Sequence, residues 1–599
     1  MVTVTRPGEG TTVGMVGPLD RGLAVLRALA RLSDDLGVRG QPGVPAVALV
    51  RATGLPRSTV DRVLLTLASS ALVDLRGHDV APAPALAALG NAYLAASRLP
   101  DVLTEHVRQL ADRFDEAVSV AVPDGGDVRY VVQIAPRRAV SPAFRVGDLL
   151  PAERCAPGHL FAAEWDEDVW EAWRARCAVP ASGERWSSAP GRSSALEQVS
   201  TRPEAGPDLR ILSALAAEQG YAVDDQLAEP GLIALAVPVR DITGAHGRAG
   251  AVLCAVSVVS HTSRHSVSSL AELALPLLRP AVTSMEAALA ADADVGPVAG
   301  ATSGHAAAGV DPSSARPAVL GTASTPAWLI GETKAALGRG YLQSLARGLT
   351  LITAFDARLR HPTLSDLARA TGLPRATVRR GLFTLVPLGY VRQDGVSAGA
   401  TFRPLPRILD LGFTSLTRKD LGAVAQPHLV RLRETVGESA SLAVLTDGEI
   451  RYVARAATTR IMSVDLAVGA MLPAYPTSMG RVLLAGLPVG EREEYLGRVR
   501  PRALTRHTVT DIGRLRDIVL AVARDGYALV REELEDGLQS LAVGVRDADG
   551  RVAAAVNVSM HADRLTAPEA LDRMLEPVRT AAEAISKDLT VLTAYRPMS

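Results

Sequence analysis

The stretch ATGLPRATVRR occupies residues 370–380, and a near copy, ATGLPRSTVDR, occupies residues 52–62. The two stretches are identical at nine of eleven positions. In each copy, Gly and Pro interrupt a helical pattern, which indicates two short helices joined by a tight turn. The repeated residues on either side of these two stretches therefore indicate the fold.

The second copy has the signals of a helix-turn-helix. Thr363 and Asp366 form a capping-box pattern that opens a first helix, and Gly372 ends it. Pro374 suits the first position of the next helix, in which Val378, Leu382 and Leu385 form an apolar stripe. Arginines off that stripe suit phosphate contact and guanine reading in the major groove. The residues predicted to contact DNA are Arg375, Ala376, Thr377, Arg379 and Arg380, together with Arg57, Ser58 and Arg62 in the first copy.

The residues that follow, GYVRQDGVSAGATFRP (389–404), contain two short β segments on either side of Asp394-Gly395. Such a hairpin predicts a wing beside the helix-turn-helix. The competing interpretation is a structural helical hairpin whose arginines only keep the surface soluble.

The repetition extends far beyond the opening stretch. Residues 115–135 align without a gap on 437–457, residues 218–241 on 524–547, and residues 255–261 on 555–561. Each unit is roughly 260–270 residues long, so the chain contains two whole modules in tandem and not a solenoid of small repeats. Between them, residues 290–335 are rich in Ala, Gly, Pro, Ser and Thr, a linker composition.

Within each module, helical periodicity gives way to alternating β-rich runs and helices, which predicts an α+β fold. The expected order is a winged helix-turn-helix domain, a linking helix and a larger domain, twice. The expected boundaries are 18–83, 84–100 and 101–289 for the first module, 290–338 for the flexible linker, and 339–404, 405–420 and 421–592 for the second module.

Composition limits the class of protein. A hydrophobic content of 48% with 21% charged residues is ordinary for a globular protein. The sequence has no uncharged run of about 18 apolar residues and no signal-peptide pattern. The three cysteines, Cys155, Cys177 and Cys254, lack paired spacing, so we expect free thiols in the cytoplasm. The zero net charge argues neither for nor against a polyanionic partner.

Several longer motifs occur in a fixed order: LARGLTLITAF (345–355), LPAYPTSMGRVLLAGL (472–487) and LEDGLQSLAVGVRDADGRVAAAVNVSMH (534–561). With the helix-turn-helix, they resemble the IclR family of transcriptional regulators. The second module is especially similar to the Pca/Pob branch, which governs catabolism of aromatic acids. The resemblance implies a winged-helix DNA-binding domain, a linking helix and a GAF-like domain that binds a small organic acid.

A ligand site in the second module is predicted from a helix start and from polar residues in apolar runs. Thr477-Ser478-Met479-Gly480 precedes an apolar helix, and backbone N–H groups at such a start form an anion site. Polar side chains among Val and Ala need partners, which a ligand, water or the local main chain can provide. The resemblance assigns matching positions to the effector pocket. The predicted effector-binding residues are Thr477, Ser478, Met479, Gly480, Arg481, Leu538, Ser540, Asn557 and Ser559.

Other positions depart from the family pattern. Arg531 stands where the family usually has an acidic residue, and it would change the charge of the pocket if it pointed inward. In the first module, Cys155-Ala156-Pro157-Gly158-His159 replaces residues 477–481, Ala234 replaces Ser540, and Val259 replaces Ser559. A different ligand and decay of the pocket are equally compatible with these changes.

The sequence gives no support for catalysis, a cofactor or a metal. His261 and His265 have helical spacing but lack a second ligand cluster. Cys155 and His159 could suggest a nucleophile and a base, but no third residue that would orient the base can be named.

The helix-turn-helix domain of each module is called its head, and the first head differs from the second by a reversed charge in the predicted DNA-binding helix. Asp61 replaces Arg379 and could pair with Arg57 four residues earlier. If both heads bind DNA, one chain mimics a dimer. If only the second head binds DNA, two chains must associate to cover two half-sites of an operator. We therefore predict a DNA-binding regulator controlled by an organic acid, with a double-stranded operator as partner and a homodimer as the expected assembly. The alternative is a ligand-sensing regulator that acts through protein contacts without binding DNA.

Overall fold

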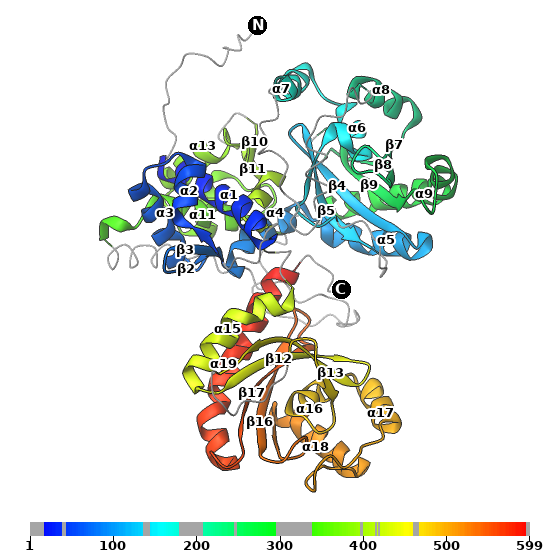
Figure 1. Cartoon of the computed structure of the whole chain (residues 1–599). Coiled ribbons are helices and arrows are strands. Elements are labelled where there is room, and N and C mark those ends of the chain that lie inside the picture. Colours follow the sequence, from blue (N-terminus) through cyan, green and yellow to red (C-terminus); the bar gives the residue numbers. More distant parts are fainter. Residues whose placement is uncertain are drawn as a thin grey trace, which may run out of the picture.

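The computed structural model describes residues 17–38, 43–135, 144–178, 208–244, 248–294, 338–395, 399–413, 416, 420–458 and 467–594. Over these residues the chain forms two copies of one module, each a helical head followed by an antiparallel sheet with helices on both faces (Figure 1). The predicted α+β class and tandem repetition are confirmed. No helix in the described part of the chain is long and apolar enough to cross a membrane.

The two heads share the predicted helix-turn-helix order. The first contains α1 (Gly17–Val38), β1 (Val44–Pro45), α2 (Ala46–Thr53), α3 (Arg57–Ser69), β2 (Val73–Arg76) and β3 (Asp79–Pro82). The second contains η4 (Gly338–Gly340), α11 (Gln343–Thr353), α12 (Leu364–Thr371), α13 (Arg375–Leu385), β10 (Val391–Asp394) and β11 (Thr401–Pro404). In each head the last two strands pair as an antiparallel wing.

Local signals explain the supporting helices. The Thr363 hydroxyl accepts the Asp366 N–H, and the Asp366 carboxylate accepts the Thr363 N–H, so the predicted capping box starts α12. Gly372 then ends this helix in the left-handed region, with φ 65°. In the first head Pro45 precedes α2 without a side-chain cap, as predicted. The second head therefore has the better-defined support for its recognition helix.

The linking segments differ from the predicted helices. In the first module η1 (Pro84–Leu86) and α4 (Ala87–Ser97) occupy most of 84–100, and α5 already begins at Leu99. In the second, the predicted α-helix over 405–420 is wrong at its start, where η5 (Pro406–Leu411) is a 3₁₀ helix that ends at Gly412. Gly412 has φ 111°, and a Cβ there would lie 2.3 Å from Leu86 Cδ2 of the first module. The chain therefore leaves the helical conformation at Gly412, where its backbone packs closely against Leu86.

The predicted linker over 290–338 also starts too early. Helix α9 (Val267–Asp294) continues through its first five residues, because Asp292 pairs with Arg98 and with Arg360 of the second head, at 3.2 and 2.8 Å. Residues 295–337 lie outside the described residues, and η4 begins at Gly338.

Both effector domains contain the same six-stranded sheet. The first adds to α5 (Leu99–Phe114) and α9 the elements β4 (Ala117–Asp124), β5 (Asp127–Ile134), β6 (Leu149–Pro151), η2 (Ala152–Arg154), α6 (Ala156–Ala162), α7 (Glu167–Ala178), α8 (Leu209–Gln219), β7 (Ala222–Asp225), β8 (Leu232–Arg240) and β9 (Val252–His261). The second contains α15 (Leu421–Val436), β12 (Ser439–Thr446), β13 (Glu449–Ala456), β14 (Met471–Pro473), α16 (Ser478–Ala485), α17 (Val489–Arg498), α18 (Ile512–Asp525), β15 (Tyr527–Arg531), β16 (Leu538–Arg546), β17 (Val552–His561) and α19 (Ala567–Thr593). The strand orders, β6-β5-β4-β9-β8-β7 and β14-β13-β12-β17-β16-β15, correspond one to one.

In the second effector domain, each face of the sheet has its own apolar core. Helices α15 and α19 pack on one face, with Leu429, Val556 and Ile585 among the buried residues. Helices α16 and α18 cover the other face, with Leu483, Val519 and Ala542 among them. The candidate ligand cavity lies on the α16 side, where the helix meets β16 and β17.

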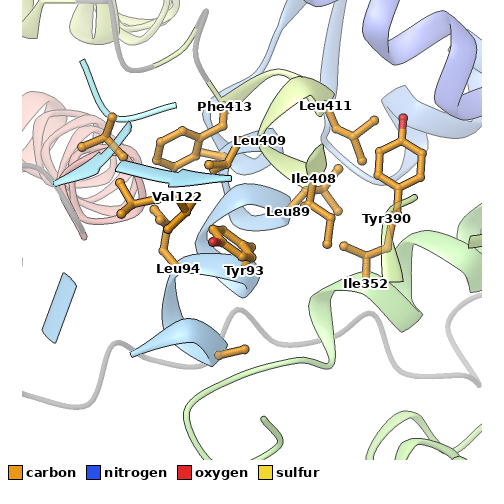
Figure 2. Close-up of a cluster of buried hydrophobic side chains, with 14 of the residues drawn as sticks. Leu89, Tyr93, Leu94, Val122, Ile352, Tyr390, Ile408, Leu409, Leu411 and Phe413 are labelled. Atoms are coloured by element: carbon orange, nitrogen blue, oxygen red, sulfur yellow. The ribbon is translucent and has the colours of Figure 1, made fainter. Parts of the chain in front are cut away.

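The modules are joined by a shared core and not only by the linker. Side chains from α4, from η5, from β4 and from the second head form one buried cluster, including Tyr93, Val122, Ile352 and Phe413 (Figure 2). Asn91 Nδ2 donates to the Val591 carbonyl at 2.9 Å, which ties α4 to the end of α19. One chain thus holds its two heads together at the crossing of its linking segments.

Candidate DNA-binding surface and effector cavity

The recognition helix of the second head, α13, separates buried and exposed residues as predicted. Val378, Leu382 and Leu385 are buried, whereas Arg375, Ala376, Arg379 and Arg380 are exposed and Thr377 is half-buried. The Arg379 guanidinium lies over the exposed ring of Phe383, 5.3 Å from its centroid. Among the described residues, no acid forms an ion pair with the three arginines of this helix. All three remain available for an anionic partner.

Helix α3 of the first head presents a weaker cationic face. Arg57, Ser58 and Arg62 are exposed, but Arg57 Nε lies 3.8 Å from Asp61 Oδ2, the predicted i, i+4 pair. Both side chains are more than half exposed, so the pair adds little stability. Its effect is electrostatic, because a carboxylate occupies the place of Arg379.

A groove of about 390 Å³ lies between the two heads. Arg62 from α3, Arg347 from α11 and Arg380 from α13 line it, and no acidic side chain does. Arg62 and Arg380 are equivalent residues of the two repeats, so each head contributes the same position of its recognition helix to the groove. Of the predicted DNA-binding residues, Arg62, Thr377 and Arg380 line this groove.

Seven of the nine predicted effector residues surround one cavity in the second effector domain: Thr477, Ser478, Met479, Leu538, Ser540, Asn557 and Ser559. The lining is completed by Tyr452, Pro476, Val530 and Leu534, none of which was predicted from the sequence. Alternation along β13 places Tyr452 on the same face as the buried Ile450, a signal that could have identified it. The space open within is about 20 Å³, room for roughly one water molecule. An organic acid would need these walls to move apart.

Polar groups lie at both sides of the cavity. Ser478 Oγ and Ser540 Oγ are 2.8 Å apart, and the backbone N–H groups of Ser478 and Met479 at the start of α16 have no acceptor among the described residues. Asn557 Nδ2 donates to Ser559 Oγ at 3.0 Å, while the buried Asn557 Oδ1 lacks a partner in the described structure. A carboxylate suits the two hydroxyls and the helix start, and a hydroxyl donor suits Asn557.

Gly480 and Arg481 lie outside the cavity lining, so their direct assignment to the ligand is not supported. A Cβ at Gly480 would lie 2.0 Å from the Ala474 carbonyl oxygen, so glycine is required there for packing. Arg481 is buried, with Nη2 2.6 Å from Glu533 Oε2 and Nε donating to the Tyr475 carbonyl. Its long side chain thus contacts the residues just before α16 and the loop after β15.

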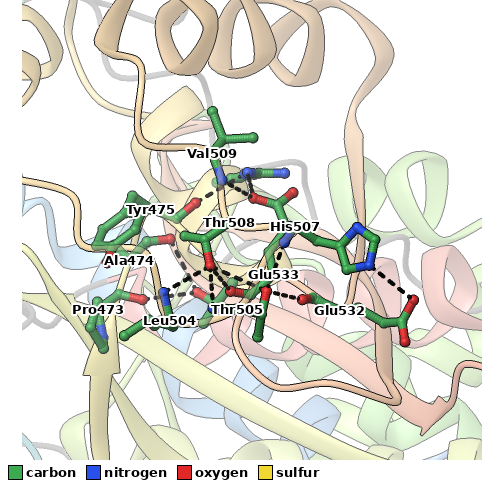
Figure 3. A network of polar contacts seen from close by, with 12 residues as sticks. Pro473, Ala474, Tyr475, Leu504, Thr505, His507, Thr508, Val509, Glu532 and Glu533 are labelled. Carbon is green, nitrogen blue, oxygen red and sulfur yellow. Dashed lines mark hydrogen bonds and ion pairs between the residues drawn. The ribbon is translucent and has the colours of Figure 1, made fainter.

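Glu533, the partner of Arg481, belongs to a wider network of polar contacts (Figure 3). Glu533 Oε2 also accepts the Val509 N–H at 3.1 Å, and the Thr508 hydroxyl donates to the Glu533 carbonyl at 2.6 Å. This network positions the loop that contributes Leu534 to the cavity. Arg531 is exposed and lies 3.6 Å from Glu532, so it does not charge the cavity.

Cys155 and His159 of the first effector domain do not form an activated nucleophile and base. Burial raises the pKa of the Cys155 thiol well above its ordinary value, and its Sγ donates to the Pro151 carbonyl at 3.4 Å. Burial also lowers the pKa of His159 to about 4. A neutral buried thiol is not nucleophilic. His265 Nε2 lies 3.6 Å from Glu116, and no group of three metal-ligating side chains occurs among the described residues.

Comparison with known proteins agrees with this arrangement. Residues 413–587 match the family described as the C-terminal domain of the bacterial transcriptional regulator IclR. Residues 18–74 and 344–395 each match the IclR helix-turn-helix domain. The matched ranges thus include both heads and the second effector domain.

Individual relatives match about one module's length. The chain is 45% identical over 250 residues to the Pca regulon regulatory protein of Pseudomonas putida, which covers 42% of this chain and 83% of that protein. It is 31% identical over 250 residues to the p-hydroxybenzoate hydroxylase transcriptional activator of Acinetobacter baylyi, covering 41% and 91%. A crystal structure of a transcriptional regulator from Rhodococcus sp. RHA1 shares 46% identity over 42% of this chain and 99% of that one, with a TM-score of 0.40.

Proposed function

Because this chain belongs to the IclR family of bacterial transcriptional regulators, which are not enzymes, we propose that it binds operator DNA and that a small organic acid controls this binding. The observation that supports DNA binding most directly is the placement of α3 and α13 beside one groove lined by three arginines. Phosphate contacts by arginine dominate affinity for duplex DNA. Exposed Arg375 and Arg379 on α13 are suited to base reading in the major groove.

Both heads of one chain face the same groove, so one chain supplies two recognition helices. The expected operator has two unequal half-sites, because the first head carries Asp61 where the second carries Arg379. In this arrangement the second head provides most of the sequence reading, and the first adds phosphate contacts through Arg62. We expect the chains to associate further as homodimers, in the cytoplasm where the operator is found.

The proposed effector is an organic acid with an aromatic ring or a second carboxylate. Ser478, Ser540 and the start of α16 would hold a carboxylate, and Tyr452 and Leu538 would pack against the rest of the molecule. The relative from Acinetobacter baylyi is named for control of p-hydroxybenzoate hydroxylase, which favours the aromatic class. Because the cavity is narrow, binding would separate α16 from β16 and shift the linking segments that hold the heads.

The test is a gel-shift titration of the intact protein on the DNA upstream of its own gene, at fixed salt, with and without benzoate, 4-hydroxybenzoate and adipate. We expect retention of that DNA over a shuffled sequence, and a change in affinity with at least one acid. Failure to retain the DNA at low salt, with every acid tried, would favour regulation through protein contacts alone. Retention that no acid changes would contradict the effector role of the cavity.

A further inference from the structure

The first effector domain has an aromatic side chain of its own at the place where the second has a cavity. The ring of Phe144 stacks on Tyr130, with centroids 5.0 Å apart and planes inclined by 8°. Tyr130 pairs with Ala121 next to a register shift between β4 and β5, just as Tyr452, which lines the second cavity, pairs with Ala443 next to a register shift between β12 and β13. The two tyrosines are therefore equivalent, and Phe144 covers the first.

One part of the pocket wall in the first domain is apolar and packs on the same ring. Ala117, Leu232, Ala234 and Val259 form a buried cluster against which Phe144 lies. Ala234 pairs with Val259 across β8 and β9, in the register in which Ser540 pairs with Ser559 across β16 and β17. Ser540 and Ser559 of the second cavity are thus replaced by hydrocarbon that contacts Phe144, whereas the buried Ser257 keeps a hydroxyl where the second domain has Asn557.

The side that would hold an anion is also changed. Ala156 and Pro157 stand at the start of α6 where the second module has Ser478 and Met479, which removes one hydroxyl and one backbone N–H. Asp224 pairs with Ala234, in the register in which Val530 pairs with Ser540, and Asp224 is buried. A carboxylate bound here would lack two hydrogen-bond donors that the second cavity provides, and it would lie near the buried Asp224.

Hydrogen bonds hold the segment that carries Phe144. Gly147 N–H donates to the Tyr130 carbonyl at 2.8 Å, and Tyr130 N–H donates to the Asp148 carbonyl at 3.0 Å. The buried Arg129 donates to the Gly147 carbonyl at 2.9 Å and also contacts Asp410 of the second linking segment at 2.8 Å. The turn after Phe144 is therefore fixed to β5 and to the other module. The equivalent position in the second module is Leu466, which is not aromatic and lies outside the described residues.

We propose that Phe144 is the permanent occupant of the first effector site, so that the first domain takes no acid and the chain responds through the second domain alone. The count of one effector per chain rests on the proposed function. The occlusion itself does not, because it follows from the packing of Phe144 against Tyr130, Ala234 and Val259. The first domain then serves as a rigid support, coupled to the second linking segment through Arg129 and Asp410.

The occlusion is tested with Phe144→Ala and with toluene as a neutral aromatic probe, since an apolar cavity left by a removed ring binds such molecules. Unfolding is followed by tryptophan fluorescence, because Trp165, Trp170 and Trp173 belong to the apolar cluster around Tyr130. We expect the melting midpoint of the variant to fall by roughly 4–8 °C. Saturating toluene should restore part of the loss and leave the parent protein unchanged. An equal toluene shift in the parent protein, or no loss in the variant, would overturn the proposal.

Phe144→Leu serves if the alanine variant does not fold, and it should give the same pattern with smaller shifts. The stoichiometry is measured separately by equilibrium dialysis with 4-hydroxybenzoate. One molecule per chain, bound more weakly in Ser540→Ala, is expected, and two per chain would contradict occlusion. If no acid binds at all, the effector part of the proposed function fails, whereas the toluene experiment still decides the role of Phe144.

Discussion

Leu345 of the second head packs against Gly22 of the first so closely that a Cβ at Gly22 would lie 2.3 Å from Leu345 Cδ1. The reciprocal contact is equally tight, since a Cβ at Gly348 would lie 2.4 Å from Leu19 Cδ1. Position 22 corresponds to 348 in the repeat and position 19 to 345, so this is the self-complementary contact of a twofold interface, made within one chain.

Gly22→Ala is therefore expected to disturb the pairing of the heads. The added methyl group would push Leu345 and α11 away from α1, with a loss of about 1–3 kcal/mol in stability. Operator affinity should fall with it, since the spacing of α3 and α13 changes. Gly490→Ala, at a helical position with no atom within 4 Å of the new Cβ, is the matched control. Chemical denaturation and DNA binding would both be measured, and equal behaviour of the two variants would show that the contact is unimportant.

The two recognition helices should contribute unequally to DNA binding. Arg375→Ala with Arg379→Ala removes two exposed, unpaired guanidinium groups, and we expect specific affinity to fall about 10- to 100-fold or more. Arg57→Ala with Arg62→Ala should cost less, because Arg57 already faces Asp61. Fluorescence anisotropy at fixed salt measures both losses, and equal losses would refute the asymmetry.

Asp61→Arg offers the converse test on the first head. The substitution replaces the carboxylate near Arg57 with the charge that the second head has at Arg379. Affinity for duplex DNA should rise, and the salt dependence should steepen by about one unit of slope. An unchanged slope would mean that α3 does not approach phosphate.

Ser540→Ala should weaken acid binding without unfolding the second effector domain. It removes the partner of Ser478, 2.8 Å away, and one predicted donor to the carboxylate. The expected loss is about 1–2 kcal/mol, or roughly 5- to 30-fold in affinity. Arg531→Ala is the control, because Arg531 lies outside the cavity lining. Isothermal titration with 4-hydroxybenzoate distinguishes them, and similar losses in both variants would argue against this cavity as the site.

Asp224 should make the first effector domain less stable as the pH rises from about 4 to about 7, while burial of His159, which lowers its pKa to about 4, acts in the opposite direction. Burial raises the pKa of Asp224 from 3.8 to about 7, so the folded domain keeps a proton that the unfolded chain has released. The contribution is fully present below the unfolded pKa and is lost as pH rises through 7. Asp224→Asn should remove this dependence and raise the melting midpoint at pH 7.5. A variant that keeps the wild-type pH profile would show that Asp224 is not the group responsible.

The sequence by itself determined the elements of each module and their order. The capping pattern of Thr363 and Asp366, the αL position of Gly372 and the apolar stripe of α13 are local, and each appears as expected. The cavity residues Ser478, Ser540 and Asn557 could be named because polar side chains in apolar runs stand out without any structure. Gly480 and Arg481 were predicted from the helix start and from the family resemblance, neither of which determines where a long side chain points.

Only the tertiary structure decided which distant residues meet. Tyr452, Val530 and Leu534 reach the cavity from strands and a loop whose approach depends on sheet register and on the Arg481–Glu533 network. The choice between a new ligand and a lost pocket in the first module depended on Phe144, whose contacts come from four separate segments. The pairing of Gly22 with Leu345 joins residues more than 300 positions apart. Periodicity and capping depend on residues close together in the sequence. The contacts named here depend on how distant segments pack within each domain and between the two modules.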